Sequence, residues 1–162
     1  MRMEIVLAYD YCNEIRELFL EYTNMLVEND ASFAQYLKLQ NYNEELEHLT
    51  DKYGLPDGRL YMAKMGNKIA GCVGLKKIDG QNCEMKRLYV RPEFRGNKIA
   101  QRLVETIICD AKKIGYQNML LDTLPFLSGA ISLYRKLGFY EIESYNNSPM
   151  DTSIYMKLDL SK

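Results

Sequence analysis

The spacing of apolar residues predicts a first third of the chain that is mainly helical. Met3–Ala8 is a short apolar run, which predicts a strand at or near the edge of a sheet. Asn13–Val27 carries apolar residues at helical spacing, and Asn43–Tyr53 repeats the pattern over a shorter stretch. Between them, a short helix is predicted over Ser32–Leu39, with its first serine as the N-terminal cap. This part should therefore supply one strand followed by helices.

After the turn cluster that ends at Gly58, the period of the pattern changes from helix to strand. Arg59–Lys64 and Lys68–Leu75 flank Gly66-Asn67, a pair that favours a tight hairpin. Cys83–Val90 follows another polar turn and has the composition of a third strand. We expect these three strands to form an antiparallel meander.

The second half of the chain predicts a crossover unit and a final strand pair. Lys98–Ile114 is an amphipathic helix closed by Gly115, and Gln117–Leu124 is an apolar strand covered on both faces. Because strand–helix–strand crossovers are right-handed, this unit places Cys83–Val90 parallel to Gln117–Leu124. The remaining predicted elements are a helix and two antiparallel strands: Pro125–Leu137, Phe139–Ser144 and Ser153–Leu160.

The predicted fold class is α/β. It has a mixed sheet, in which an antiparallel meander joins one parallel central pair of strands, and helices cover both faces. A length of 162 residues suits one domain, so residues 1–162 are predicted to form a single domain.

Composition argues against several classes of partner. A net charge of −1 gives no general field to attract nucleic acid, so no nucleic-acid partner is expected. No apolar run approaches the roughly 20 residues that span a bilayer, so no membrane partner is expected. The four cysteines lack CxxC spacing and are expected to be free thiols in a reducing cytoplasm. The single histidine, His48, is predicted to lie on a helix surface, and no metal site is expected.

The stretch Met85–Leu103 carries the most informative local chemistry. It is predicted to be a strand that ends before Pro92, then a polar turn, then the start of a helix. A helix N-terminus offers unpartnered N–H groups and a partial positive charge, which suit a phosphate. Arg95 and Lys98 add full positive charges there. An ordinary strand–helix turn with a solvated arginine explains the same local residues.

The stretch Leu88–Leu103 resembles the acyl-CoA-binding signature of the GNAT acetyltransferase superfamily. Arg95 matches the first position of that signature and Ala100 the last, whereas Lys98 stands where the family usually has glycine. Downstream, Ala130–Phe139 resembles the tyrosine-bearing helix of the family. The resemblance covers roughly Gly58 to Leu160, and implies a GNAT acyl-CoA N-acyltransferase-like fold with acetyl-CoA as co-substrate.

The resemblance also implies that the two parallel central strands splay apart and that the cofactor binds in the opening. The pantetheine arm would pair with backbone groups of Leu88 and Val90, and the pyrophosphate would lie on the amides of Arg95 through Ala100. We expect Lys98 in the first helical turn, where φ is negative and a lysine costs little, and Gly96 or Asn97 in left-handed conformations. The implied cofactor-binding residues are Leu88, Tyr89, Val90, Arg95, Gly96, Asn97, Lys98, Ile99 and Ala100.

The implied reaction moves an acetyl group to a primary amine by direct attack in a ternary complex. Tyr134 matches the family's tyrosine and is the candidate acid for the departing thiolate, with a core tyrosine that packs against the sheet as the alternative. Glu84 is the candidate base, directly or through water, with a surface carboxylate as the alternative. Strand alternation should place Glu84, Lys86 and Leu88 on one face and Arg87 on the other.

The acceptor is the least determined part of the prediction. In the family its groove is walled by the first helices and the loop before the last strand, here about Met25–Tyr53 and Tyr145–Thr152. Acidic and aromatic residues there would suit a cationic amine, unless they only form a solvated helix face. These residues are Tyr36, Tyr42, Tyr53, Tyr145, Glu28, Asp30, Glu44 and Glu45. A small-molecule amine, an amino acid and a protein amine stay open as acceptors, and so does a homodimer.

Two other functions fit parts of the sequence. A non-catalytic acyl-CoA-binding sensor would use the same loop, although the presence of Tyr134 argues against it. A nucleotide-binding protein could use Arg95–Ala100 as a phosphate loop, but both GxGxxG and GxxxxGK[ST] are absent.

Overall fold

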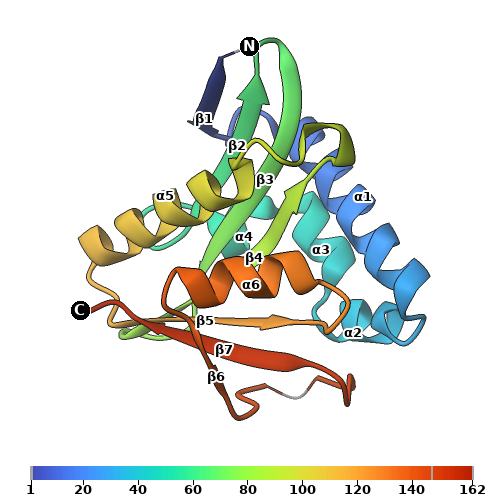
Figure 1. Cartoon of the computed structure of the whole chain (residues 1–162), viewed down its shortest axis with the longest axis vertical. Coiled ribbons are helices and arrows are strands. Elements are labelled where there is room, and N and C mark those ends of the chain that lie inside the picture. Colours follow the sequence, from blue (N-terminus) through green and yellow to red (C-terminus); the bar gives the residue numbers. More distant parts are fainter. Residues whose placement is uncertain (1, 147, 162) are drawn as a thin grey trace.

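The computed structural model describes residues 2–146 and 148–161, and its centre is a mixed sheet. Within this part of the chain, seven strands lie in the order β1-β2-β3-β4-β5-β7-β6, with β1 at one edge (Figure 1). Only β4 and β5 pair in parallel, as predicted, and the other neighbours are antiparallel. The strands are β1 (Met3–Leu7), β2 (Arg59–Met65), β3 (Lys68–Lys77), β4 (Asn82–Val90), β5 (Asn118–Thr123), β6 (Tyr140–Ile142) and β7 (Ile154–Asp159).

Helices cover both faces of the sheet, which confirms the predicted layers. The helices are α1 (Cys12–Asn29), α2 (Phe33–Leu39), α3 (Tyr42–Glu47), α4 (Leu49–Tyr53), α5 (Ile99–Ile114) and α6 (Ser128–Lys136), with a 3-10 turn at Pro92–Phe94. Helices α1 to α4 bury Phe19 and Tyr53 in a core on one face. Helices α5 and α6 bury Leu103 and Tyr134 in a second core on the other face, in front of the sheet in Figure 1.

Three predicted helix features differ from the structure. The helix predicted over Asn43–Tyr53 is two short helices, because His48 has an extended φ of −131° and interrupts it. Ser32 precedes α2 but does not cap it, since its hydroxyl donates to the Asp30 carboxylate (2.6 Å). Helix α6 begins at Ser128 rather than Pro125, because the preceding residues form a turn in which the Leu127 N–H donates to the Leu124 carbonyl (3.0 Å).

Strand β4 contains a bulge that breaks the predicted alternation of its side chains. Lys86 pairs with Gly74 and Tyr89 pairs with Cys72, so two residues of β4 oppose one of β3. Arg87, at the bulge, has a left-handed φ of 61°. Arg87 and Lys86 both donate to Gln40 Oε1, so their side chains lie on the same side, whereas Leu88 packs against the core on the other face. The predicted faces of Arg87 and Leu88 are therefore wrong. Gly74 accommodates the packing here, since a Cβ on it would lie 2.8 Å from the Tyr53 ring.

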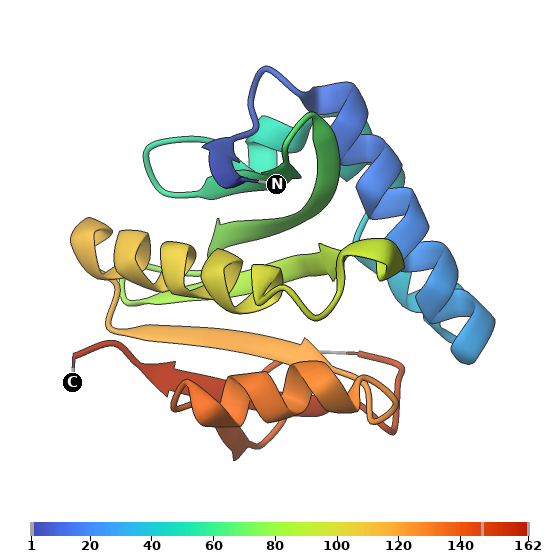
Figure 2. The same cartoon turned by 45° about the horizontal axis from the view of Figure 1, so that its top comes forward.

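Strands β4 and β5 diverge from a short paired segment. Their register covers Asn82 with Asn118 through Glu84 with Leu120, and it stops there. Figure 2 shows the two strands separating toward their carboxyl ends. From Met85 onward, the edge of β4 that faces β5 has backbone groups outside the sheet ladder. This divergence is the feature that positions the site described below.

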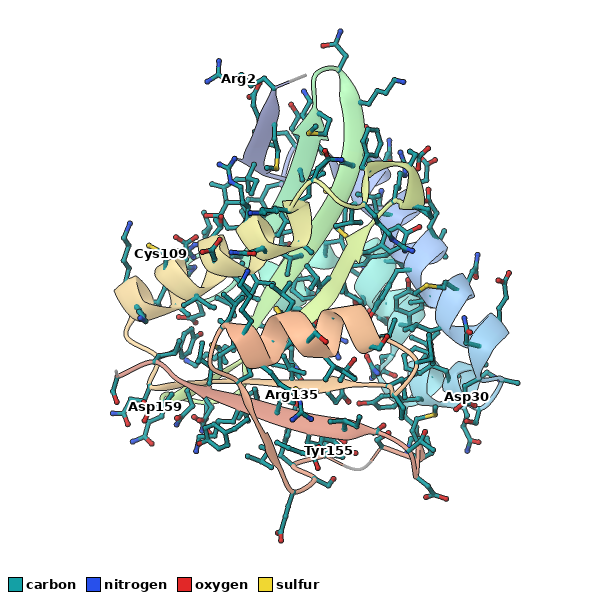
Figure 3. The ribbon with its side chains drawn as sticks, viewed as in Figure 1. Arg2, Asp30, Cys109, Arg135, Tyr155 and Asp159 are labelled. Carbon is teal, nitrogen blue, oxygen red and sulfur yellow. The ribbon has the colours of Figure 1, made fainter. Side chains whose placement is uncertain are left out.

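The four cysteines are free thiols, as predicted, and Cys109 is exposed on α5 (Figure 3). Among the described helices, none has the length and apolar character needed to cross a membrane.

Candidate active site

A cavity lies between the diverging ends of β4 and β5, and we call it the inner cavity. Its walls include Lys86, Arg87 and Leu88 from β4, Asp122 from β5 and Tyr134 from α6. The cavity is at the carboxyl ends of the two parallel strands, where open α/β sheets commonly bind ligands. Polar and titratable side chains thus meet in a largely apolar enclosure.

A surface groove leads to this cavity along β4, and we call it the loop groove. Leu88, Tyr89, Val90, Arg95 and Ala100 form one wall, and the segment 126–130 before and within α6 forms the other. Leu88 lines both the groove and the inner cavity, so the two are adjacent. Five of the nine residues that the family signature implied for the cofactor therefore line one groove.

The loop at the end of this groove has the backbone of an anion-binding turn. Gly96 has φ +87°, as expected, whereas Asn97 does not adopt a left-handed conformation and donates from its side chain to the Phe94 carbonyl (2.9 Å). Arg95 donates from Nε to the Val90 carbonyl (3.2 Å), which ties the loop to the end of β4. The Arg102 N–H donates to the Lys98 carbonyl at the start of α5, so the amides before it precede the helical ladder.

The prediction for Lys98 is wrong. It has φ +60° rather than a negative φ, and it is the N-cap of α5 rather than a residue of its first turn. For a non-glycine residue this conformation costs roughly 1–2 kcal/mol, which explains why the family usually has glycine here. Two left-handed residues, Gly96 and Lys98, alternate along the loop and turn its successive N–H groups toward one concavity. The loop therefore keeps the shape of a phosphate cradle and adds a lysine.

Tyr134 lies on the buried side of α6, and its ring packs against Phe139 with centroids 5.7 Å apart. It also lines the inner cavity, so the packing role and the candidate acid role coexist. Burial raises the pKa of the Tyr134 phenol well above its ordinary value, which keeps the hydroxyl protonated at neutral pH.

Glu84 lines a second hollow, which lies beside the inner cavity on the side of α2. We call this hollow the outer opening. The buried Glu84 carboxylate accepts a hydrogen bond from the Tyr145 hydroxyl (2.6 Å) and lies 3.7 Å from Lys76 Nζ. Tyr145 packs edge-on against Tyr155 of β7, which Figure 3 labels. Lys86 lines both the inner cavity and the outer opening, so these are also adjacent.

Asp122 is a site residue that the sequence interpretation missed. Its carboxylate lies in the inner cavity and accepts hydrogen bonds from the Tyr36 hydroxyl and from Asn146 Nδ2 (3.1 Å). The signal was present, because Asp122 is an acidic residue at the end of an otherwise apolar central strand. Tyr36 itself is kept protonated, since burial and the Asp122 charge raise the pKa of its phenol.

A buried polar cluster supports β4 at the bulge. Arg87 Nε donates to Glu45 (2.9 Å), and Lys52 Nζ donates to the same carboxylate (2.8 Å). Gln40 Oε1 accepts from both Arg87 (2.7 Å) and Lys86 (2.9 Å). Burial alone would raise the pKa of Glu45, but the charges of Arg87 and Lys52 lower it to about 2. Glu45 is therefore an ionised partner of Arg87 inside the fold.

The acidic wall expected around the acceptor is not what the structure contains. The Glu45 carboxylate is paired with Arg87 inside the buried cluster, while Glu28 and Glu44 are exposed to solvent. The outer opening is instead lined by Lys52, Lys76 and Lys86, together with Tyr36 and Tyr145 from the predicted aromatic set. Across residues 2–146 and 148–161, no group of three His, Cys, Asp or Glu side chains is arranged to hold a metal ion.

Comparisons with known proteins agree with this geometry. The profile of the Acetyltransferase (GNAT) family matches residues 13–139. An uncharacterized N-acetyltransferase of Schizosaccharomyces pombe is 43% identical over 132 residues, which cover 80% of this chain and 81% of the relative. Another, of Dictyostelium discoideum, is 33% identical over 222 aligned positions, covering 99% of this chain and 100% of the relative.

The fold is also that of solved acetyltransferases. The crystal structure of the PaiA N-acetyltransferase of Thermoplasma acidophilum in complex with coenzyme A superposes with a TM-score of 0.72 at 20% identity, and the match covers 98% of this chain and 99% of that one. The family profile spans most of the chain, the two relatives align over most of their length, and the sheet diverges at the expected strand pair. This chain is a member of the GNAT acetyltransferase family.

Proposed function

We propose that the protein transfers an acetyl group from acetyl-CoA to a primary amine by direct attack in a ternary complex. The observation that carries the proposal is that the loop groove, the inner cavity and the outer opening lie side by side. Leu88 lies between the first two spaces and Lys86 between the last two, so ligands that enter from the two sides would meet beside Tyr134. Coenzyme A bound to a relative of the same fold supports acetyl-CoA as the co-substrate.

In the proposed complex, the pantetheine arm pairs with the free edge of β4, where backbone groups near Leu88 and Val90 act like a strand partner. The pyrophosphate lies on the loop amides from Gly96 to Ala100, and the partial positive charge of the α5 N-terminus stabilises it. Arg95 has two roles in this arrangement, since it holds the loop against β4 and adds a positive charge beside the phosphates.

The chemistry requires one bond to form, one to break and two protons to move. The neutral amine nitrogen attacks the thioester carbonyl carbon, and the carbon–sulfur bond breaks as the thiolate leaves. Tyr134, which stays protonated at neutral pH, hydrogen-bonds to the departing sulfur and gives it the phenolic proton. Glu84 takes the amine proton through water, because it lies at the outer opening rather than in the inner cavity.

A sensor that binds acetyl-CoA without transferring the acetyl group would share the loop groove. The experiment that separates the two functions combines calorimetric titration of acetyl-CoA with measurement of free thiol during incubation with primary amines. The proposal predicts binding together with amine-dependent release of coenzyme A. Binding without any amine-dependent release would favour the sensor, and absence of binding would contradict both.

A further inference from the structure

Lysines are concentrated at the outer opening, where two of them share one carboxylate: Glu84 lies 3.7 Å from Lys76 Nζ and 4.0 Å from Lys86 Nζ. Three lysines line this opening, Lys52, Lys76 and Lys86, and the acids nearby already have donors. Glu84 accepts from Tyr145, and Asp122 accepts from Tyr36 and Asn146. Among the described residues, only Lys52 of these three lysines lies within hydrogen-bond distance of a carboxylate, which belongs to Glu45.

Lys86 is the critical member of this set, since its side chain is only 8% exposed. Its ammonium donates to the neutral Gln40 Oε1 at 2.9 Å, and the Glu84 carboxylate lies 4.0 Å away, outside hydrogen-bond distance. An ammonium has three donors, and a buried cation without a close counter-ion is costly. Burial, and after it the nearby Arg87 charge, lower the pKa of Lys86 to about 8, and the charges of Glu84, Asp122 and Glu45 oppose this shift.

The position of Lys86 makes it a recognition group for the acceptor. It lines the inner cavity that contains Tyr134 and also the outer opening through which an acceptor would enter. Beyond it, Leu39 is 61% exposed and Ile78 is 40% exposed, and both line the outer opening. An acceptor bound here would contact the Lys86 ammonium beside the reaction centre, and the apolar side chains of Leu39 and Ile78 farther from it.

We propose that the acceptor is a free α-amino acid with an apolar side chain, whose carboxylate binds Lys86 while its amine faces the thioester. This assignment rests on the proposed acetyl transfer and specifies its substrate class. The carboxylate of an α-amino acid is one carbon from the amine, so binding at Lys86 keeps the nucleophile in the inner cavity. Lys76, 3.7 Å from Glu84, adds a second positive charge at the outer opening, and Leu39 and Ile78 contact the side chain.

The reaction balances without a further reactant. The α-nitrogen forms a bond with the acetyl carbonyl carbon, the carbon–sulfur bond breaks, and the nitrogen proton leaves through water while the sulfur gains one. The products are an N-acetyl amino acid and coenzyme A. The carboxylate stays ionised throughout and remains paired with Lys86, so it serves binding rather than bond making.

The test compares L-leucine with L-leucinamide, which lacks the carboxylate charge. Because the amide also has a less basic amine, kcat/KM is expressed per concentration of neutral amine for both acceptors. Coenzyme A release gives kcat/KM for each, and we expect the free amino acid to be preferred by at least about tenfold, the effect of one charged hydrogen bond. Lys86→Met should reduce that preference about tenfold, through KM for leucine, and Lys76→Met about threefold. Lys77→Met is the matched control, because Lys77 is the next residue on β3, pairs with Asp57 and does not line the outer opening. It should leave the preference unchanged.

The ratio of the two acceptors cancels effects that are common to both. Calorimetric binding of acetyl-CoA to Lys86→Met shows whether that variant is folded, and Lys76→Met supplies the answer if it is not. Equal use of the two acceptors by the unmodified protein would overturn the assignment, although the acetyl transfer would stand. An equal fall in kcat for both acceptors in Lys86→Met would also overturn it, since that pattern indicates a proton-transfer role. If no amine releases coenzyme A, the proposed function itself fails.

Discussion

Replacing Glu45 with glutamine should destabilise the protein far more than its position on a short helix suggests. The Glu45 side chain is 0% exposed, and it contacts Arg87, Lys52 and the Tyr53 hydroxyl (3.0 Å). Glutamine keeps the size of the side chain but removes its charge, which leaves the Arg87 guanidinium buried without a counter-ion. Breaking a buried pair in this way costs about 3–5 kcal/mol.

The pKa of Glu45 gives a second estimate of the same cost. A fall from the ordinary value of 4.5 to about 2 corresponds to about 3 kcal/mol of stability, at about 1.4 kcal/mol for each pH unit. Because the folded-state pKa is depressed, this contribution is fully present above pH 4.5 and is lost as the pH falls toward 2. The two estimates agree, and for a domain of this size about 3 kcal/mol lowers Tm by roughly 6–12 °C.

Urea unfolding followed by circular dichroism measures this effect directly. Glu45→Gln should lose about 3 kcal/mol at pH 7, and the difference from the unmodified protein should shrink below pH 4.5. Glu44→Gln is the control, because Glu44 is the preceding, solvent-exposed residue of α3 and its loss should change stability by less than about 0.5 kcal/mol. If the free energy of unfolding of Glu45→Gln lies within about 1 kcal/mol of that of the unmodified protein, the assignment of an ionised buried pair is refuted.

Two further predictions concern the loop groove. Arg95→Ala should weaken acetyl-CoA binding by about 1.5–3 kcal/mol in calorimetry, because it removes the loop anchor and a charge beside the phosphates; unchanged affinity in a folded variant would place Arg95 outside the site. Lys98→Gly should relieve the left-handed strain and so keep the free energy of unfolding within about 1 kcal/mol, whereas Lys98→Val, which is β-branched, should lower it measurably in urea unfolding. Equal stability of the two Lys98 variants would contradict the observed φ.

The layers of the fold could be predicted because they depend on local patterns. Apolar–polar alternation identifies strands, helical spacing of apolar residues identifies helices, and the Gly66-Asn67 turn identifies the β2–β3 hairpin. The rule that crossovers are right-handed then orients β4 and β5 in parallel. The divergence of this pair was implied only by the family resemblance. The bulge at Arg87, in the ladder between β3 and β4, is held by Glu45 and Gln40, which lie more than forty residues away in sequence.

The errors at the site have the same origin. Lys98 follows the pattern of a helix start, and only the usual glycine of the family indicated that the backbone there is left-handed. Glu45 looked like part of an acidic acceptor wall because its partner, Arg87, was assigned to the opposite face of β4. Asp122 was readable from the sequence, since an acid that ends an apolar strand beside a predicted cleft is unusual.

The central claim is that acetyl transfer takes place beside Tyr134, and the rate of coenzyme A release by Tyr134→Phe tests it most directly. Phenylalanine keeps the ring that packs against Phe139 and removes only the hydroxyl. With both proteins saturated in acetyl-CoA and the amine acceptor, the account predicts that kcat falls by roughly 10²-fold, while acetyl-CoA affinity changes by less than about threefold. Near-full turnover by Tyr134→Phe, with chemistry as the slow step, would contradict the claim and leave Tyr134 as a packing residue.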